Sequence, residues 1–293
     1  MDLSRLLPDL PPVVVLCAYG ASLVVNGLSS TGTLGGKSIG QLSDENPTYV
    51  TPDGLTFAVW SVIYLLEGVL VCAQMRPTPH AEELLSQKCP LTGLPVRWRI
   101  LLFIVANTAW LPIYLQEQWT LSFLVILVYL AGLISVYTAL NTNSTESVAE
   151  WVTYGAGVSA NASWLLVASA ANAFTVGKHS GWEDSYGIGG TAKAAACVVM
   201  VVAAIGIAMA VVRRDFVWSA VAAWAAAGIY RMQTVPDQES FPVVSHSPYL
   251  ANVAWWGSLL VTLASVVGLL LMLKEGLPGK PRYEDESLMS VVE

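Results

Sequence analysis

Long apolar runs separated by short polar stretches dominate this chain. Eight runs of roughly 17 or more residues carry few charges, and a bilayer core needs about 20 predominantly apolar residues per helix. The runs lack the alternation of apolar and polar positions that a membrane β-barrel requires. The pattern therefore predicts an all-α integral membrane helical bundle with spans at residues 12–29, 53–75, 98–115, 119–140, 152–174, 194–212, 215–232 and 250–273.

The basic residues divide unevenly between the two sides of this eight-span topology. Ten of the 14 Lys and Arg residues fall on the side that holds both chain ends. Cytoplasmic loops are enriched in Lys and Arg, so we expect both termini to face the cytoplasm or its equivalent. The basic residues on the opposite side are Lys37, Lys178, Lys193 and Arg231.

Composition excludes several functional classes. Hydrophobic residues make up 55% of the chain and charged residues only 12%, with a formal net charge of -7, so no basic stripe is present for nucleic acid. The four cysteines have no metal-site spacing, and the three histidines lie in polar connecting stretches, which argues against a haem held by histidines within the bundle. No catalytic motif is present, and we expect a protein that is not an enzyme and has no covalent cofactor.

Polar side chains at membrane depth are the first candidates for function, because they are costly to bury there. In the second span Trp60, Tyr64 and Glu67 share one helix face with Asp53 and Phe57. Glu67 is the only carboxylate near the middle of a span. Two interpretations are open: a neutral hydrogen bond that joins two helices, or a contact with a proton or a ligand.

The third and fifth spans add asparagine and tryptophan side chains at helical spacing. Together with the second span they suggest a shared, partly polar lining. The alternative is close helix packing, for which the small residues of the fifth span are typical. Trp98, Trp119 and Trp151 stand at span ends and are predicted to anchor the protein at the membrane surface. The candidate lining residues of these two spans are Asn107, Trp110, Tyr114, Asn161, Trp164, Ser169 and Asn172.

Three segments resemble signatures of the TspO/MBR family, the tryptophan-rich sensory proteins and translocator proteins. Segment 52–66 (PDGLTFAVWSVIYLL) is similar to the family's Pro-Gly-aromatic-Val-Phe, Trp and Tyr-Leu-Leu pattern. Segment 107–114 (NTAWLPIY) resembles Asn-x-x-Trp-x-Pro-x-Phe, and segment 164–172 (WLLVASAAN) resembles Trp-Val-x-x-Ala-(Ser/Thr)-x-x-Asn. The chain is thereby identified as a TspO-like protein in which three further spans follow a five-helix core, similar to an extended branch of the family.

The resemblance implies a cavity that accepts tetrapyrroles or other flat hydrophobic ligands, with sterols or lipids bound by some members. It also implies that the loop between the first two helices covers this cavity. Carried over by motif and helix face, the ligand-binding residues would be Trp60, Tyr64, Asn107, Trp110, Trp164 and Asn172, with Glu67 as a polar or proton contact.

The predicted organisation is an N-terminal tail (1–11), a five-helix core (12–175), additional transmembrane helices (176–274) and an acidic flexible tail (275–293). Expected partners are membrane lipids and a hydrophobic small molecule, with a homodimer or a membrane complex as further options. Besides ligand binding in a sensing, storage or transport role, two functions stay open. One is an accessory subunit of a larger membrane complex, docked through the added helices. The other is a secondary transporter with Glu67 as its proton site, although no inverted repeat is visible.

Overall fold

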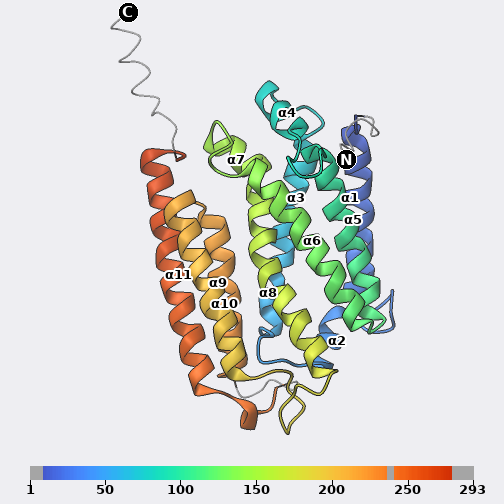
Figure 1. Cartoon of the computed structure of the whole chain (residues 1–293), viewed down its shortest axis with the longest axis vertical. Helices are drawn as coiled ribbons and strands as arrows, with labels where there is room; N and C mark the ends of the chain where they lie inside the picture. The colour runs from blue at the N-terminus through green and yellow to red at the C-terminus, as the bar shows by residue number, and fades with distance from the viewer. Residues whose placement is uncertain (1–8, 236–240, 279–293) are drawn as a thin grey trace, which may run out of the picture.

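A single bundle of long helices forms the body of the protein (Figure 1). The computed structural model describes residues 9–235 and 241–278, and 74% of this part of the chain is helical, without strands. The predicted tails lie largely outside it, at residues 1–8 and 279–293. The long helices within the described part are α1 (Pro12–Ser30), α3 (Val59–Ala73), α5 (Val96–Leu115), α6 (Trp119–Leu140), α8 (Ala156–Lys178), α9 (Ala192–Arg213), α10 (Phe216–Met232) and α11 (Pro248–Glu275).

Short helices occupy the two ends of the bundle. One end carries α2 (Ile39–Glu45) and the 3-10 turn η2 (Gly54–Ala58) that leads into α3, and is called the α2 end below. The opposite end carries α4 (Pro79–Ser86) and α7 (Val148–Tyr154). Helix α1 begins and α11 ends at the end that carries α4 (Figure 1).

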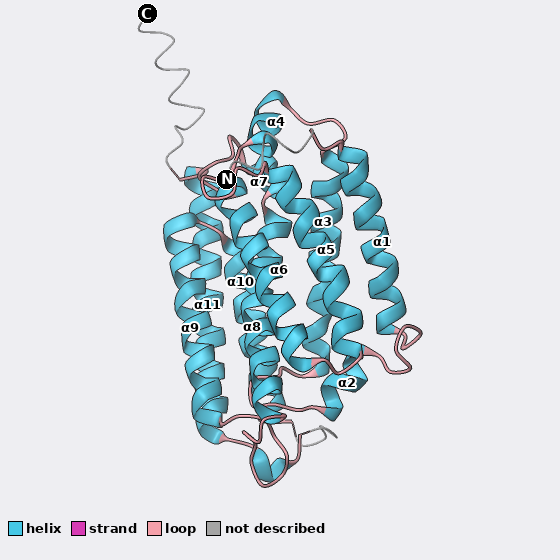
Figure 2. Ribbon diagram, turned by 45° about the vertical axis from the view of Figure 1, so that its right-hand side comes forward, coloured by secondary structure: helices cyan, strands magenta, loops and turns pink. Residues whose placement is uncertain are grey.

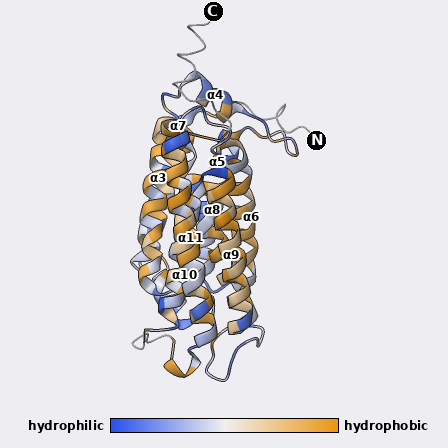
Figure 3. Cartoon of the chain, turned by 90° about the vertical axis from the view of Figure 1, so that its left-hand side faces the viewer, coloured by the Kyte–Doolittle hydropathy of each residue, from blue (hydrophilic) through white to orange (hydrophobic). Residues whose placement is uncertain are grey.

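Within the described residues, six helical stretches are apolar and long enough to cross a membrane, which fits an integral multi-pass protein. They are α1, α5, α6, α9, α11 and the continuous run of η2 and α3 (Gly54–Ala73). Apolar residues cover most of their length, and hydrophilic residues gather toward the ends of the bundle (Figure 3). Helices α8 and α10 fall outside these six. In α8, 15 of 23 residues are buried, against seven of 28 in α11. A helix surrounded by protein needs less apolar surface than one that faces lipid, so α8 can be rich in small and polar residues.

The fifth predicted span, 152–174, differs from the structure. The chain forms α7, turns at Gly155 and starts α8 at Ala156. A Cβ at Gly155 would lie only 2.6 Å from Cδ1 of Trp151, so the close turn requires glycine. Trp151 is not a surface anchor as predicted, because it is fully buried and packs edge-on against Phe216.

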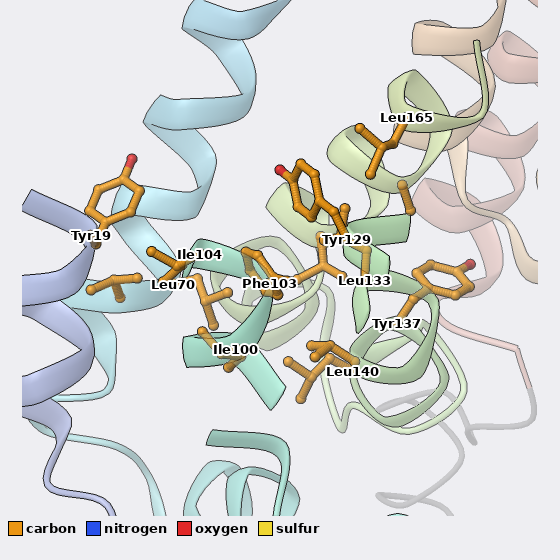
Figure 4. Close-up of a cluster of buried hydrophobic side chains, with 14 of the residues drawn as sticks. Tyr19, Leu70, Ile100, Phe103, Ile104, Tyr129, Leu133, Tyr137, Leu140 and Leu165 are labelled. Carbon is orange, nitrogen blue, oxygen red and sulfur yellow. The ribbon is translucent and has the colours of Figure 1, made fainter. Parts of the chain in front are cut away.

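Apolar clusters hold the helices together, and two of them join the first five long helices to one another and to the last three. The larger joins α1, α3, α5, α6 and α8 through side chains such as Leu70, Phe103 and Tyr129 (Figure 4). A second cluster contains Ile63, Trp164 and Val221 and joins α3 and α8 to the three-helix unit α9–α11, which packs along one side of the bundle (Figure 2). The last three helices are therefore part of the same packed body as the first five.

Helix α8 approaches α3 closely at Gly157. A Cβ there would lie 2.8 Å from the backbone nitrogen of Glu67 and 2.8 Å from the carbonyl carbon of Leu66. Small residues permit this close approach. The van der Waals contacts that it allows hold the helices together in lipid, where no hydrophobic driving force acts between them. The contact fixes the spacing of the two helices whose aromatic side chains form the site described next.

Candidate functional site

A cavity of about 550 Å³ lies at the α2 end, among α1, α3, α5 and α8. The segment from Ser38 to Gly54, which includes α2, covers it. Small-molecule sites in proteins have volumes of roughly 300 to 1,000 Å³ and are mostly apolar with a few polar groups. Its size and its lining therefore fit a ligand-binding site. The aromatic residues of the lining are Phe57, Trp60, Tyr64, Trp110, Tyr114 and Trp164.

Most of the residues predicted to bind ligand meet at this cavity. Trp60, Tyr64, Trp110, Trp164 and Asn172 all line it. Asn107 and Glu67 do not line it. Both are 3% exposed and lie about one helical turn further from the α2 end than Trp110 and Tyr64. Helical spacing places these two residues on the same helix faces as Trp110 and Tyr64, but those faces extend beyond the cavity.

The aromatic rings fix one another in place. Trp60 stacks on Tyr64 with centroids 5.4 Å apart and an interplanar angle of 19°. Trp164 meets Trp60 edge-on at 6.1 Å and Phe57 edge-on at 5.8 Å. Stacked and edge-to-face pairs are favourable by about 0.5–1.5 kcal/mol beyond the area they bury. The cavity therefore offers rigid, flat ring surfaces from α3 and α8.

Asn172 positions a tryptophan. Its Oδ1 accepts hydrogen bonds from Trp110 Nε1 at 3.3 Å and Ser122 Oγ at 2.9 Å, and its Nδ2 donates to the carbonyl of Ala168 at 3.0 Å. Both ends of the amide are satisfied. Trp164 differs, because its buried Nε1 has no acceptor in the described part of the protein. A buried donor without a partner is costly.

A polar network continues from the cavity wall into the bundle. Tyr64 Oη donates to Asn26 Oδ1 at 2.5 Å, and Tyr19 Oη donates to the carbonyl of Tyr64. Deeper still, Asn161 Nδ2 donates to Glu67 Oε1 at 2.6 Å and also contacts Tyr129 Oη. This hydrogen bond of Glu67 links α3 to α8. It matches one of the two interpretations of Glu67, a hydrogen bond that joins two helices.

Comparison with known proteins identifies the family. A model of the family described as TSPO-like protein matches residues 12–268. This chain belongs to the TSPO-like family. The match includes α9, α10 and most of α11, so the family relation extends over the three-helix unit as well as the first five long helices. No curated protein and no solved structure matches the chain.

In this TSPO-like protein α10 braces the cavity wall. Asp53, 2% exposed, accepts hydrogen bonds from Arg231 Nε at 2.6 Å and from the hydroxyl of Thr56. The N–H of Asp53 donates to the carbonyl of Gly228 at 3.1 Å, and Trp224 Nε1 donates to the carbonyl of Thr56 at 2.8 Å. The segment that begins α3 and lines the cavity is therefore attached to α10.

Sequence reasoning did not assign these α10 residues to the site. Trp224 and Arg231 lie in the seventh span, more than 160 positions after the wall segment that they contact. The available signal was the charge of Arg231 at the end of an apolar run, because such a charge requires a partner or solvent. Its partner is Asp53, which the sequence analysis had assigned only to a helix face.

The loop between α8 and α9 holds the same C-terminal part of the covering segment. The N–H of Tyr49 donates to the carbonyl of Gly189 at 3.0 Å, and Tyr49 Oη donates to Asp184 at 2.8 Å. Burial raises the pKa of Asp184, but hydrogen bonds from Ile188, Tyr49 and Tyr186 outweigh it, so the pKa is lowered overall. Asp184 is thus an ionised anchor, and the C-terminal part of the cover is attached both to the α8–α9 loop and to α10.

Proposed function

We propose that this TSPO-like membrane protein binds a flat hydrophobic ligand of tetrapyrrole size in the cavity at the α2 end, in a sensing, storage or transport role. The observation that carries the proposal is the convergence of Trp60, Tyr64, Trp110 and Trp164 on one cavity of about 550 Å³. These side chains come from α3, α5 and α8, and each lies in a segment that resembles a family signature.

The geometry favours a flat ring system. Trp60 and Tyr64 stack, while Trp164 stands edge-on to Trp60, which leaves planar surfaces against which a macrocycle can pack. Aromatic side chains prefer offset-stacked or edge-on partners. A flexible lipid chain or a sterol would use the apolar volume but gain less from these planar faces.

A titration of the purified protein in uncharged detergent tests this proposal. Protoporphyrin IX dimethyl ester is a suitable probe, because it is flat, of the proposed size and without charge. We expect saturable quenching of tryptophan fluorescence with about one porphyrin per chain, since one cavity brings several indoles next to the ligand. A control titration of protein-free micelles measures how much porphyrin partitions into the detergent. Quenching that rises without saturation, as in those micelles, would contradict the proposal.

A further inference from the structure

The cavity at the α2 end opens on one side of the bundle. Every exposed residue of its lining belongs to α1, to α2 or to the segment 54–61 that begins α3. Leu23 and Gly27 on α1 and Ser61 on α3 are among them. The lining residues of α5 and α8, in contrast, are buried or partly buried. The opening therefore lies between α1, α2 and the start of α3.

Helices α1 and α3 contact each other next to this opening without closing it. Tyr19 Oη donates to the carbonyl of Tyr64, and a Cβ at Gly68 would lie 3.4 Å from the same hydroxyl. Nearer the α2 end, Tyr64 Oη donates to Asn26 Oδ1 at 2.5 Å. A Cβ at Gly27, the next residue of α1, would meet nothing within 4 Å. The two helices are thus joined at Tyr19 and Tyr64, and free space remains beside Gly27.

The opening extends into the part of the bundle that lipid surrounds. Helix α1 stands at the edge of the bundle (Figures 1 and 2). Leu23 precedes the end of α1 at Ser30 by seven residues, which is about 10 Å along a helix. The exposed apolar side chains of Val24 (61%) and Val62 (52%) lie next to it on α1 and α3. Both helices belong to stretches that can span a membrane, so these side chains face the hydrocarbon of the bilayer.

On the side of water, at the α2 end, the covering segment is packed onto the bundle. Leu42 of α2 is 1% exposed and belongs to the larger apolar cluster. A Cβ at Gly35, in the loop before α2, would lie 3.1 Å from Cβ of Leu115 at the end of α5. Tyr49 binds the segment to the α8–α9 loop. A ligand that arrives from water would have to displace these contacts, whereas a ligand in the bilayer would not.

We propose that the ligand enters and leaves the cavity from the bilayer, through the opening between α1 and the start of α3. This inference rests on the proposed function and adds a property of the ligand, which must be dissolved in the membrane. An uncharged flat macrocycle meets this requirement. The small residues Gly27 and Ser61 stand on the two edges of the opening and make room for such a molecule to pass between the helices.

Bulky side chains on the two edges test this route. Gly27→Phe and Ser61→Phe each place a ring in the opening. Stopped-flow tryptophan quenching measures the association of protoporphyrin IX dimethyl ester, and mixing the complex with an excess of empty micelles measures its dissociation. We expect each variant to lower both rates about fivefold or more and to keep Kd within about threefold of the wild-type value, because an obstacle on the route slows both directions alike.

Gly20→Phe is the matched control. Gly20 is exposed on α1 outside the lining, and a Cβ there also meets nothing within 4 Å, so this variant should keep both wild-type rates. Gly40→Phe tests entry from water, because Gly40 is an exposed lining residue of α2. Stronger slowing in Gly40→Phe than in Gly27→Phe would overturn the inference and indicate entry under the covering segment.

Two further results would overturn the inference and leave the proposed function standing. One is unchanged rates in both edge variants, Gly27→Phe and Ser61→Phe. The other is weaker binding through faster dissociation alone, which would mean that these residues contact the bound ligand and do not lie on its route. If one edge variant fails to fold, the other decides. If the ester does not bind saturably to the wild-type protein, the proposed function itself fails.

Discussion

Replacing Gly157 by alanine is expected to lower the stability of the protein. The added Cβ would lie 2.8 Å from backbone atoms of Leu66 and Glu67. Backbone cannot rotate away as a side chain can, so α8 must move off α3. Overpacking of this kind costs about 1–3 kcal/mol, and Gly157→Leu should prevent the native packing altogether.

Thermal unfolding in detergent measures this effect. Gly20→Ala in α1 is the matched control, because a Cβ at Gly20 meets nothing within 4 Å and alanine is the better helix former. We expect Gly20→Ala to unfold at or above the wild-type temperature and Gly157→Ala several degrees below it. Equal unfolding temperatures for the two variants would show that α3 and α8 are not held at this spacing.

Replacing Gly228 by leucine is expected to reduce ligand affinity about tenfold or more while the helical bundle remains folded. A Cβ at Gly228 would lie 2.7 Å from Cγ2 of Thr56 and 2.8 Å from Cβ of Pro52. Pro52 lines the cavity, so a larger side chain on α10 displaces the cavity wall. The brace formed by Trp224 and Arg231 would be strained by the same displacement.

The porphyrin ester titration, with circular dichroism as a check of helix content, measures the effect of Gly228→Leu. Ala220→Leu places the same side chain at an exposed position of α10 and should bind like the wild type. Wild-type affinity in Gly228→Leu would mean that α10 does not determine the shape of the site. If Gly228→Leu loses helix content, the smaller substitution Arg231→Gln tests whether α10 determines the shape of the site. This substitution removes only the ion pair with Asp53.

The helices could be predicted well from the sequence because a bilayer demands long apolar runs. The predicted span 119–140 coincides with α6, and the ends of most other spans move by a few residues. The start of α8 was misplaced because Val152 and its neighbours continue the apolar pattern through Gly155. A close backbone approach to Trp151 causes that break, and hydropathy carries no information about such an approach.

The cavity was predictable in part. Spacing along single helices brought Trp60, Tyr64, Trp110, Trp164 and Asn172 to one place, because residues three or four apart share a face. How far the cavity extends along each helix depends on the tertiary structure. The sequence therefore could not predict that Asn107 and Glu67 lie outside the lining. The contribution of α10 was also hidden, because Asp53 and Arg231 are 178 positions apart in the chain.

In the proposed function, the ligand packs against the aromatic surface of this cavity. Trp60→Leu removes one stacking face, and because Trp60 is only partly buried, the change should lower stability less than the loss of a fully buried tryptophan would. Trp256→Leu is the matched control, since Trp256 is 58% exposed on the outer side of α11.

The most direct test measures porphyrin ester affinity and unfolding temperature on both variants. We predict that Trp60→Leu still folds but binds about tenfold more weakly, which corresponds to about 1.4 kcal/mol, and that Trp256→Leu binds like the wild type. Wild-type affinity in Trp60→Leu, or an equal loss in both variants, would contradict the account.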